Sequence, residues 1–100
     1  MRVIALSTLR RFWESSEAYS AVREPALAWY RHVLAADWAS PAALKADFGA
    51  ANIRKDGRVV FNLGGNKFRP VVKINYSQRI IYIRFIGTHR QYDQIDAQAI

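Results

Sequence analysis

The stretch RVVFNLGGNKFRPVVKINYSQRIIYIRFIG, residues 58–87, contains three runs of β-branched and aromatic residues. Such runs are typical of strands, and we predict strands at 58–63, 67–76 and 80–87. The segment GGN between the first two supplies residues that accept a positive φ in a tight turn, and SQR reverses the chain again. Three strands with two short connections predict an antiparallel meander.

Pro70 lies inside the second of these predicted strands. Because proline has no N–H, it cannot donate to a sheet ladder, and it is normally confined to edge strands and bulges. We therefore expect an edge position or a β-bulge at this point of the sheet.

The first half of the chain has the spacing of helices. A short β-branched run at 2–7 predicts an opening strand. The residues after it recur at the i, i+3, i+4 spacing of one helix face: Leu9, Phe12 and Trp13. Ser7 or Thr8 is the expected N-cap, because a hydroxyl can accept from the first free N–H groups.

Two prolines mark the start of two further predicted helices, since proline fits the first helical turn. One helix is expected from about Glu24, and the other from Ser40 to about Phe48. These elements predict a single domain, residues 1–100, of the α+β class. Two to three N-terminal helices would pack on one face of a mostly antiparallel, three- to four-stranded sheet.

The composition limits the setting of the protein. The chain has no cysteine, which excludes disulfides and thiolate zinc sites. No apolar stretch approaches the ~20 residues of a membrane span, and the start MRVIALSTLRRFW has too short an apolar run for a secretory signal. We expect a cytoplasmic protein with no membrane partner.

The positive charge is concentrated in one region. Of the net charge of +7, residues 54–90 contribute nine Lys and Arg against a single acidic residue, Asp56, whereas residues 1–53 are almost balanced. A potential of this sign favours polyanions such as nucleic acid, or an acidic protein partner.

Strand alternation predicts which side chains share a face of the sheet. The apolar set includes Ile81, Ile83 and Phe85, which the helices should cover. The opposite, exposed face would carry four cations and one aromatic ring: Lys67, Arg69, Lys73, Arg84 and Tyr82. An inert face would mix both signs, because like charges directly opposite each other destabilise a sheet. This face therefore favours nucleic acid, whose phosphates meet cations and whose bases stack on rings.

His89 and Tyr92 follow the third strand and would lie side by side if HRQYDQI forms a helical turn. Strict alternation leaves His89 on the covered face, so it reaches the exposed face only if the chain turns at Gly87. An imidazole can take or give a proton near neutrality, while cations stabilise charge on a phosphate. A lone histidine is more often structural than catalytic, but beside a cluster of arginines His89 becomes a candidate for proton transfer in RNA cleavage.

Other chemistries lack their motifs. The chain has no phosphate loop, no GxGxxG, no GxSxG and no pair of histidines at metal spacing, so we expect neither cofactor nor metal. His32 falls in the polar phase of the second predicted helix and is expected to be a bystander.

The segment RVVFNLGGNKFRPVVKINYSQRIIYIRFIGTHRQYDQID, residues 58–96, closely resembles the HigB toxins of bacterial type II toxin-antitoxin systems. These toxins are part of the RelE/ParE-like superfamily. The turn FNLGGNKFR, the strand end YIRFIGTH and the tail YDQID carry the resemblance. It implies a RelE-like fold and a metal-independent mRNA interferase. Such an endoribonuclease cuts messenger RNA on the translating ribosome, with the 2'-hydroxyl attacking the adjacent phosphate.

The resemblance also implies roles for single residues. Arg69 and Arg84 match positions on an RNA-facing sheet, where they would stabilise the charge of the transition state. His89 and Tyr92 match the C-terminal motif, with proton transfer or base stacking as their roles. Further RNA contacts are expected from four residues: Lys67, Lys73, Tyr82 and Arg90.

The implied partner is a helix-turn-helix antitoxin of the HigA type. The complex of the two proteins would repress its own operon, so that operator DNA is bound only through that complex. We expect an acidic or amphipathic antitoxin segment against residues 54–90, because unpaired cations are costly to desolvate against an apolar partner. Two other interpretations stay open: a DNA gyrase poison of the ParE type, and a non-catalytic nucleic-acid-binding module.

Overall fold

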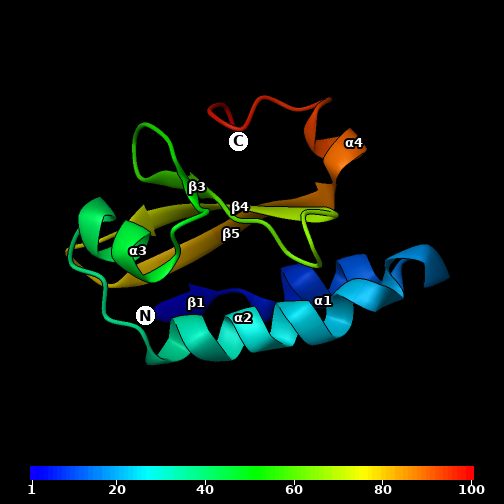
Figure 1. Ribbon diagram of the computed structural model, residues 1–100, viewed down its shortest axis with the longest axis horizontal. Coiled ribbons are helices and arrows are strands. Elements are labelled where there is room, and N and C mark those ends of the chain that lie inside the picture. The colour runs from blue at the N-terminus through cyan, green and yellow to red at the C-terminus, as the bar shows by residue number, and fades with distance from the viewer.

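A single five-stranded sheet forms the middle layer of the molecule, as described by a computed structural model that covers residues 1–100 (Figure 1). Its strands are β1 (Arg2–Ile4), β2 (Asn52–Ile53), β3 (Arg58–Val60), β4 (Phe68–Asn75) and β5 (Ile80–Thr88), in the spatial order β1-β5-β4-β3-β2. β1 pairs with β5 in parallel, and all other pairs are antiparallel. The predicted meander is confirmed, and the short strand β2 is an addition to it.

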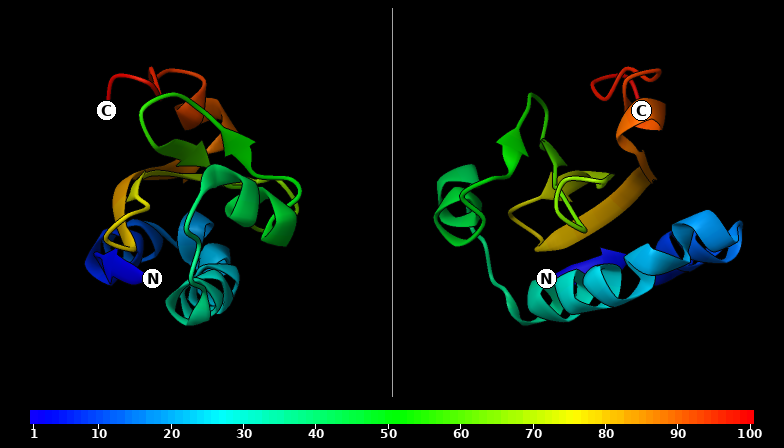
Figure 2. Two further views of the ribbon diagram at one scale, coloured as in Figure 1. Left: turned by 90° about the vertical axis from the view of Figure 1, so that its left-hand side faces the viewer. Right: turned by 45° about the vertical axis from the view of Figure 1, so that its right-hand side comes forward.

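The helices are α1 (Leu6–Glu14), the 3-10 helix η1 (Glu17–Val22), α2 (Arg23–Ala35), α3 (Pro41–Asp47) and, after the last strand, α4 (His89–Tyr92). α1 and α2 cover one face of the sheet, whereas α4 lies on the opposite side (Figures 1 and 2). α1 and α2 run side by side beneath the sheet (Figures 1 and 2). Between them and the sheet lies a core of 19 buried residues, to which Leu9 and Val33 contribute from the helices and Val72 and Ile81 from the strands. The α+β class is confirmed. None of the helices is both long and apolar enough to cross a membrane.

The helix starts agree with the sequence at two places and differ at one. Ser40 caps α3, since its hydroxyl oxygen accepts from the N–H of Ala43 at 3.2 Å, and Pro25 lies in the first turn of α2 as expected. The predicted cap at Ser7 or Thr8 is wrong, because α1 already begins at Leu6. β1 ends at Ile4, before the polar residues Ser7 and Thr8. The N–H of Thr8 donates to the carbonyl of Ala5 in the first turn of α1.

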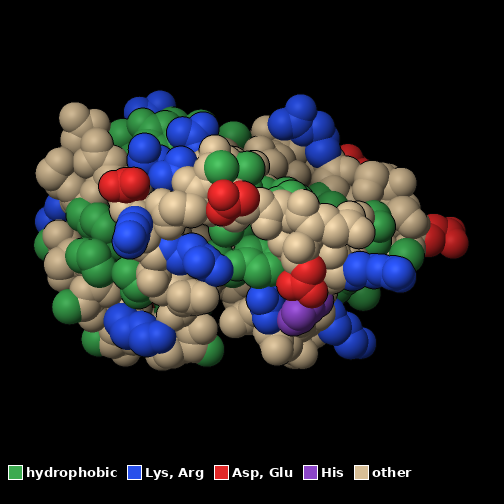
Figure 3. Space-filling model, turned by 90° about the horizontal axis from the view of Figure 1, so that it is seen from above, with side chains coloured by type: hydrophobic (Ala, Val, Ile, Leu, Met, Phe, Trp, Pro, Cys, Tyr) green, Lys and Arg blue, Asp and Glu red, His purple; other side chains and the backbone are tan.

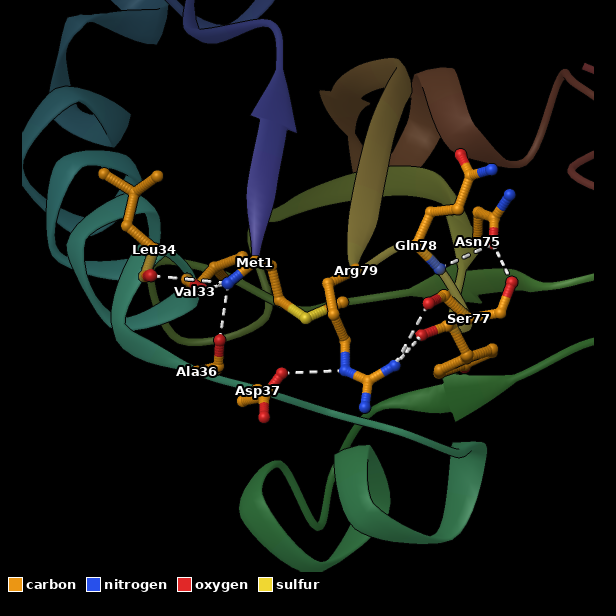
Figure 4. Close-up of polar contacts among 10 residues, drawn as sticks. Met1, Val33, Leu34, Ala36, Asp37, Asn75, Ser77, Gln78 and Arg79 are labelled. Atoms are coloured by element: carbon orange, nitrogen blue, oxygen red, sulfur yellow. Dashed lines mark hydrogen bonds and ion pairs between the residues drawn. The ribbon is translucent and has the colours of Figure 1, made fainter.

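The end of α2 is tied to the start of the chain. The Met1 nitrogen donates to the carbonyl oxygens of Val33 at 3.2 Å, of Leu34 at 3.3 Å and of Ala36 (Figure 4). Carbonyl groups in the last turn of a helix have no partner inside the helix. The bonds from Met1 supply a partner for Leu34 and Ala36, add a second one to Val33, whose oxygen also accepts from the N–H of Ala36, and hold β1 beside α2.

Pro70 occupies a central strand, so the expected edge position is wrong. Its carbonyl oxygen accepts from the N–H of Phe61 at 3.0 Å. In an antiparallel strand, the N–H and the C=O of one residue point toward the same neighbouring strand. The missing N–H of Pro70 would therefore point toward the side of β3, beyond its last residue Val60, and not toward β5. The ladder between β4 and β5 therefore loses no bond at the proline.

A bulge does occur nearby, in the partner strand. Val71 pairs with Phe85 and Val72 pairs with Ile83, which leaves Arg84 as an extra residue of β5. The bulge reverses the alternation after it. Phe85, expected on the helix-covered face, therefore points to the opposite side.

The other face of the sheet is partly covered as well. Residues 93–100, here called the C-terminal segment, cross above β3 and β4, on the side opposite α1 and α2 (Figures 1 and 2). Between this segment and the sheet lies a small cluster of buried residues to which both contribute: Val60, Val71, Tyr92 and Ala97, with Phe85, Ile95 and Ile100 packed against it. Arg58 Nε donates to the carbonyl of Ile100 at 2.9 Å, and Gln98 exchanges bonds with the backbone of Lys55. The expectation of a fully exposed face is therefore corrected.

Candidate nucleic-acid interface

The face opposite the helices, called the basic face below, is defined by cross-strand pairing, because directly opposed residues of neighbouring strands project to the same side. One row across four strands consists of Arg58, Lys73, Tyr82 and Ile4. All charged strand residues of this face are cations: Arg2, Arg58, Arg69, Lys73 and Arg84. Seen from this side, Lys and Arg side chains are spread over the surface (Figure 3).

These cations have few acidic partners within the protein. Of the nine Lys and Arg between 54 and 90, only Arg79 forms an ion pair, with Asp37 at 2.7 Å. Like charges gathered on one side of a small domain repel each other and favour a polyanionic partner. The basic face is thus left to be neutralised from outside.

Arg69 and Tyr92 form one cluster on this face. The guanidinium carbon of Arg69 lies 4.9 Å from the centroid of the Tyr92 ring, within the range of a cation–π interaction. Tyr92 is only 9% exposed, and its hydroxyl accepts from Nη2 of Arg54 at 2.9 Å. The buried Nε of Arg69 has no hydrogen-bond partner. Arg54 was not predicted as a site residue. The sequence indicates a role for it only by its position at the start of the cation-rich residues 54–90.

Arg84 and Tyr82 form a second cluster. The guanidinium carbon of Arg84 lies 5.5 Å from the centroid of the Tyr82 ring, and Lys73 is the cross-strand partner of Tyr82. Arg84 is exposed, because the bulge at this position turns its side chain outward. The sheet residues predicted for the site thus share a face, in two groups separated by the pair Val71 and Phe85.

The predicted helical turn after β5 is present as α4. Thr88 is its N-cap: its hydroxyl accepts from the N–H of Gln91 at 3.2 Å, and the Gln91 side chain accepts from the N–H of Thr88 at 2.8 Å. The N–H of His89 donates to the carbonyl of Lys67 at 3.1 Å. This bond fixes α4 to the beginning of β4, so that Lys67 and His89 lie at the same end of the sheet.

The turn expected at Gly87 lies one residue later, because Gly87 is still part of β5. The glycine is required for packing. A Cβ at this position would lie 2.5 Å from the Phe85 ring and 2.9 Å from the Gln91 side chain. Gly87 therefore allows Phe85 and α4 to close over the end of the strand.

His89 is oriented by a carboxylate. Its Nδ1 lies 3.1 Å from Oδ2 of Asp93, one helical turn later, and its side chain is 50% exposed. Because a carboxylate only accepts, the hydrogen of a neutral ring is held on Nδ1. Nε2 is then left as a free acceptor at the rim of the basic face. Arg90, next to it, is exposed and makes no ion pair.

The second histidine belongs to a different part of the molecule. His32 on α2 contacts both carboxylate oxygens of Asp47 on α3, at 3.0 and 2.9 Å, and Trp38 donates to the same carboxylate at 3.0 Å. The hydrogen bond from His32 lowers the pKa of Asp47, with a smaller contribution from Trp38. This cluster joins two helices and does not lie on the basic face. No group of three or more histidines and carboxylates is close enough to hold a metal ion.

Residues 22–95, which include all eight predicted site residues, match the HigB_toxin family, described as the RelE-like toxic component of a toxin-antitoxin system. Three curated proteins are 30% identical to the chain over 90 residues, which cover 88% of this chain and 86% of each relative. They are the mRNA interferase toxin HigB of Escherichia coli K12 and the proteins called mRNA interferase HigB of Escherichia coli O157:H7 and Shigella flexneri.

Proposed function

The chain belongs to the HigB family of RelE-like toxins, and on this premise we propose that it is an endoribonuclease that cleaves messenger RNA. The similar proteins of Escherichia coli and Shigella are named for this activity. The observation that carries the proposal is the basic face, on which none of the cationic strand residues forms an ion pair with an Asp or Glu side chain. RNA supplies the missing negative charge.

The proposed reaction is transesterification within the RNA. Nε2 of His89 accepts the proton of a 2'-hydroxyl, the freed oxygen attacks the adjacent phosphorus, and the bond from phosphorus to the 5'-oxygen breaks. The leaving oxygen takes up a proton, giving a 2',3'-cyclic phosphate on one fragment and a 5'-hydroxyl on the other. Arg69, Arg84 and Lys67 supply positive charge where negative charge builds up on the phosphate oxygens.

Tyr92 is the proposed source of that second proton. Its oxygen accepts from Arg54, so its own hydrogen is available to another acceptor. Its ring is buried and lies against Arg69, which favours proton transfer over base stacking as its role. Proton exchange with solvent would return His89 and Tyr92 to their starting states. Lys73, Tyr82 and Arg90 would contact the RNA on either side.

The setting of the reaction is part of the same proposal. We propose that the toxin acts without a metal ion on mRNA held by translating ribosomes in the cytoplasm, and that a HigA-type helix-turn-helix antitoxin neutralises it. Operator DNA would be bound only by the complex of the two. The cationic surface of residues 54–90 supports an acidic or amphipathic antitoxin segment at this place.

The test is to add the protein to translating ribosomes, with EDTA-treated free RNA in parallel, and to map the RNA ends. New 5'-hydroxyl ends paired with 2',3'-cyclic or 3'-phosphate ends are expected, and they should be absent with folded His89→Ala. If no new ends appear while gyrase cleavage complexes accumulate, the protein is a gyrase poison. If it binds RNA with a steep salt dependence and cuts nothing, it is a binding module.

A further inference from the structure

Ile4, on the edge strand β1, is one of only two large hydrophobic residues that are exposed in this protein. It is 37% exposed, and the other, Leu34 on α2, is 45% exposed. Ile4 is the parallel partner of Tyr82 in β5, so that the two side chains lie next to each other on the basic face. An exposed aliphatic side chain therefore extends the surface of an aromatic ring.

Cations surround this pair on three sides. Lys73 is the partner of Tyr82 in the next strand, and the Arg84 guanidinium lies 5.5 Å from the Tyr82 ring. Arg2, two residues before Ile4 in the same strand, projects to the same face and is exposed. None of the three cations forms an ion pair. The result is a small apolar platform with positive charge around it.

This combination is suited to single-stranded nucleic acid. A base stacks on an aromatic ring with only a modest preference for its identity, which is set by stacking strength, and the phosphates on either side of the base attract Lys and Arg. A neutral apolar partner would leave three unpaired cations desolvated. The sign of the charge thus selects a polyanion as occupant.

Except for Arg84, which belongs to both places, the platform lies apart from the groups assigned to cleavage. Along β4, Lys73 follows Arg69 by four residues, which corresponds to about 13 Å at the rise of a strand. Val71 and Phe85, which pack beneath the C-terminal segment, lie between the two places. A base held by the platform is therefore not part of the linkage that is cut.

We propose that Ile4 and Tyr82, flanked by Arg2, Lys73 and Arg84, form a stacking subsite for a base of single-stranded RNA away from the scissile phosphate. The subsite rests on the proposed function, because its occupant is the RNA to be cleaved. Its contribution is to affinity and to the choice of cleavage position, and β1 is required for it although no residue of β1 takes part in the chemistry.

The experiment compares Ile4→Ser with Leu34→Ser, which removes the other exposed aliphatic side chain from the helical side. Binding of a fluorescent RNA oligonucleotide with 2'-O-methyl groups, which cannot be cleaved, is measured by anisotropy. Ile4→Ser should weaken binding several-fold, and Tyr82→Ala by about 5- to 100-fold. Leu34→Ser should bind as the wild type does.

Cleavage gives the second measurement. With ribosome-bound mRNA, Ile4→Ser should raise KM, leave kcat unchanged, and relax the base preference at a fixed distance from the cut. Equal binding and equal cleavage positions for Ile4→Ser and Leu34→Ser would overturn the subsite. Weakening of binding to an acidic antitoxin peptide, with RNA binding unchanged, would also overturn it by assigning the platform to a protein.

The two proposals fail in different ways. If the wild type cleaves RNA and Ile4→Ser behaves identically, the subsite is wrong and the endoribonuclease stands. If the wild type cleaves nothing but binds the uncleavable RNA through Ile4, the subsite stands and the catalytic proposal is wrong.

Discussion

The two faces of the sheet serve different purposes. The helix-covered face contributes to a core of 19 buried residues without a buried charge, whereas the basic face contributes only to a cluster of four buried residues that it shares with the C-terminal segment. Burial of apolar area is the main source of stability, and unpaired cations oppose it. The comparison indicates that the helical layer holds the fold together and leaves the other face available for a charged ligand.

The largest expected effect separates the two histidines. Both side chains are about half exposed, 49% for His32 and 50% for His89, and each contacts one aspartate. His89→Ala should reduce RNA cleavage by about 10²- to 10⁴-fold, as expected for loss of a proton acceptor. His32→Ala should leave the rate unchanged. Cleavage assays on ribosome-bound mRNA, with circular dichroism to check folding, measure both, and equal rates for the two variants would contradict the division of the faces.

The next comparison uses two neighbouring residues of β4. Val72 and Val71 are both fully buried, but Val72 belongs to the 19-residue core and Val71 to the small cluster under the C-terminal segment. Val72→Ala should lower the free energy of unfolding by about 2 kcal/mol and Val71→Ala by about 1 kcal/mol, because a thinly covered site relaxes more easily. Urea denaturation gives both values. A larger loss for Val71→Ala would show that the C-terminal segment is as important for stability as the helices.

Gly87→Ala tests the packing between β5 and α4. The new Cβ would be 2.5 Å from the Phe85 ring, so that the ring or the helix must move, at a cost of about 1–3 kcal/mol. The shift should lower the cleavage rate, because His89 and Tyr92 lie on α4. Thermal unfolding and cleavage are measured together. Gly49→Ala is the matched control, since a Cβ there would meet no atom within 4 Å, and equal behaviour of the two variants would be evidence against a close contact.

The smallest expected effect is a pH dependence of thermal stability, which arises from Asp47 among the helices. The pKa of Asp47 is lowered from its usual 3.8 mainly by the hydrogen bond with His32, so its ionised form stabilises the folded state. This stabilisation is present above the unfolded pKa and is lost as the pH falls through the folded pKa. Between about pH 5 and about pH 2, the Tm of the wild type should therefore decrease more than that of Asp47→Asn. Parallel curves for the two proteins would contradict this assignment.

The local pattern of the chain predicted most of the fold. The turn at GGN has positive φ at Gly64, Gly65 and Asn66, and the cap at Ser40 is in place. Both depend on neighbouring residues, so a short window of sequence contains the information. The pairing of β1 with β5 and the strand β2 were not predicted, because short edge strands are determined by the partner they find.

The candidate site was predictable in its residue types and not in its arrangement. Alternation correctly placed Arg69 and Lys73 on one face, but the bulge at Arg84 moved Phe85 to that face as well. The contact of Arg54 with Tyr92 joins residues 38 positions apart, which no local pattern reveals. The roles of these residues in catalysis stay predictions.

The sequence by itself determined the helices, the meander and a surplus of positive charge in its second half, since these follow from side-chain size, periodicity and charge. The tertiary structure alone decided which cations lie together, which are covered by the C-terminal segment, and that Ile4 lies beside Tyr82. The physical reason is that a single extra residue in a strand reverses its faces, and that contacts between distant residues depend on packing throughout the molecule.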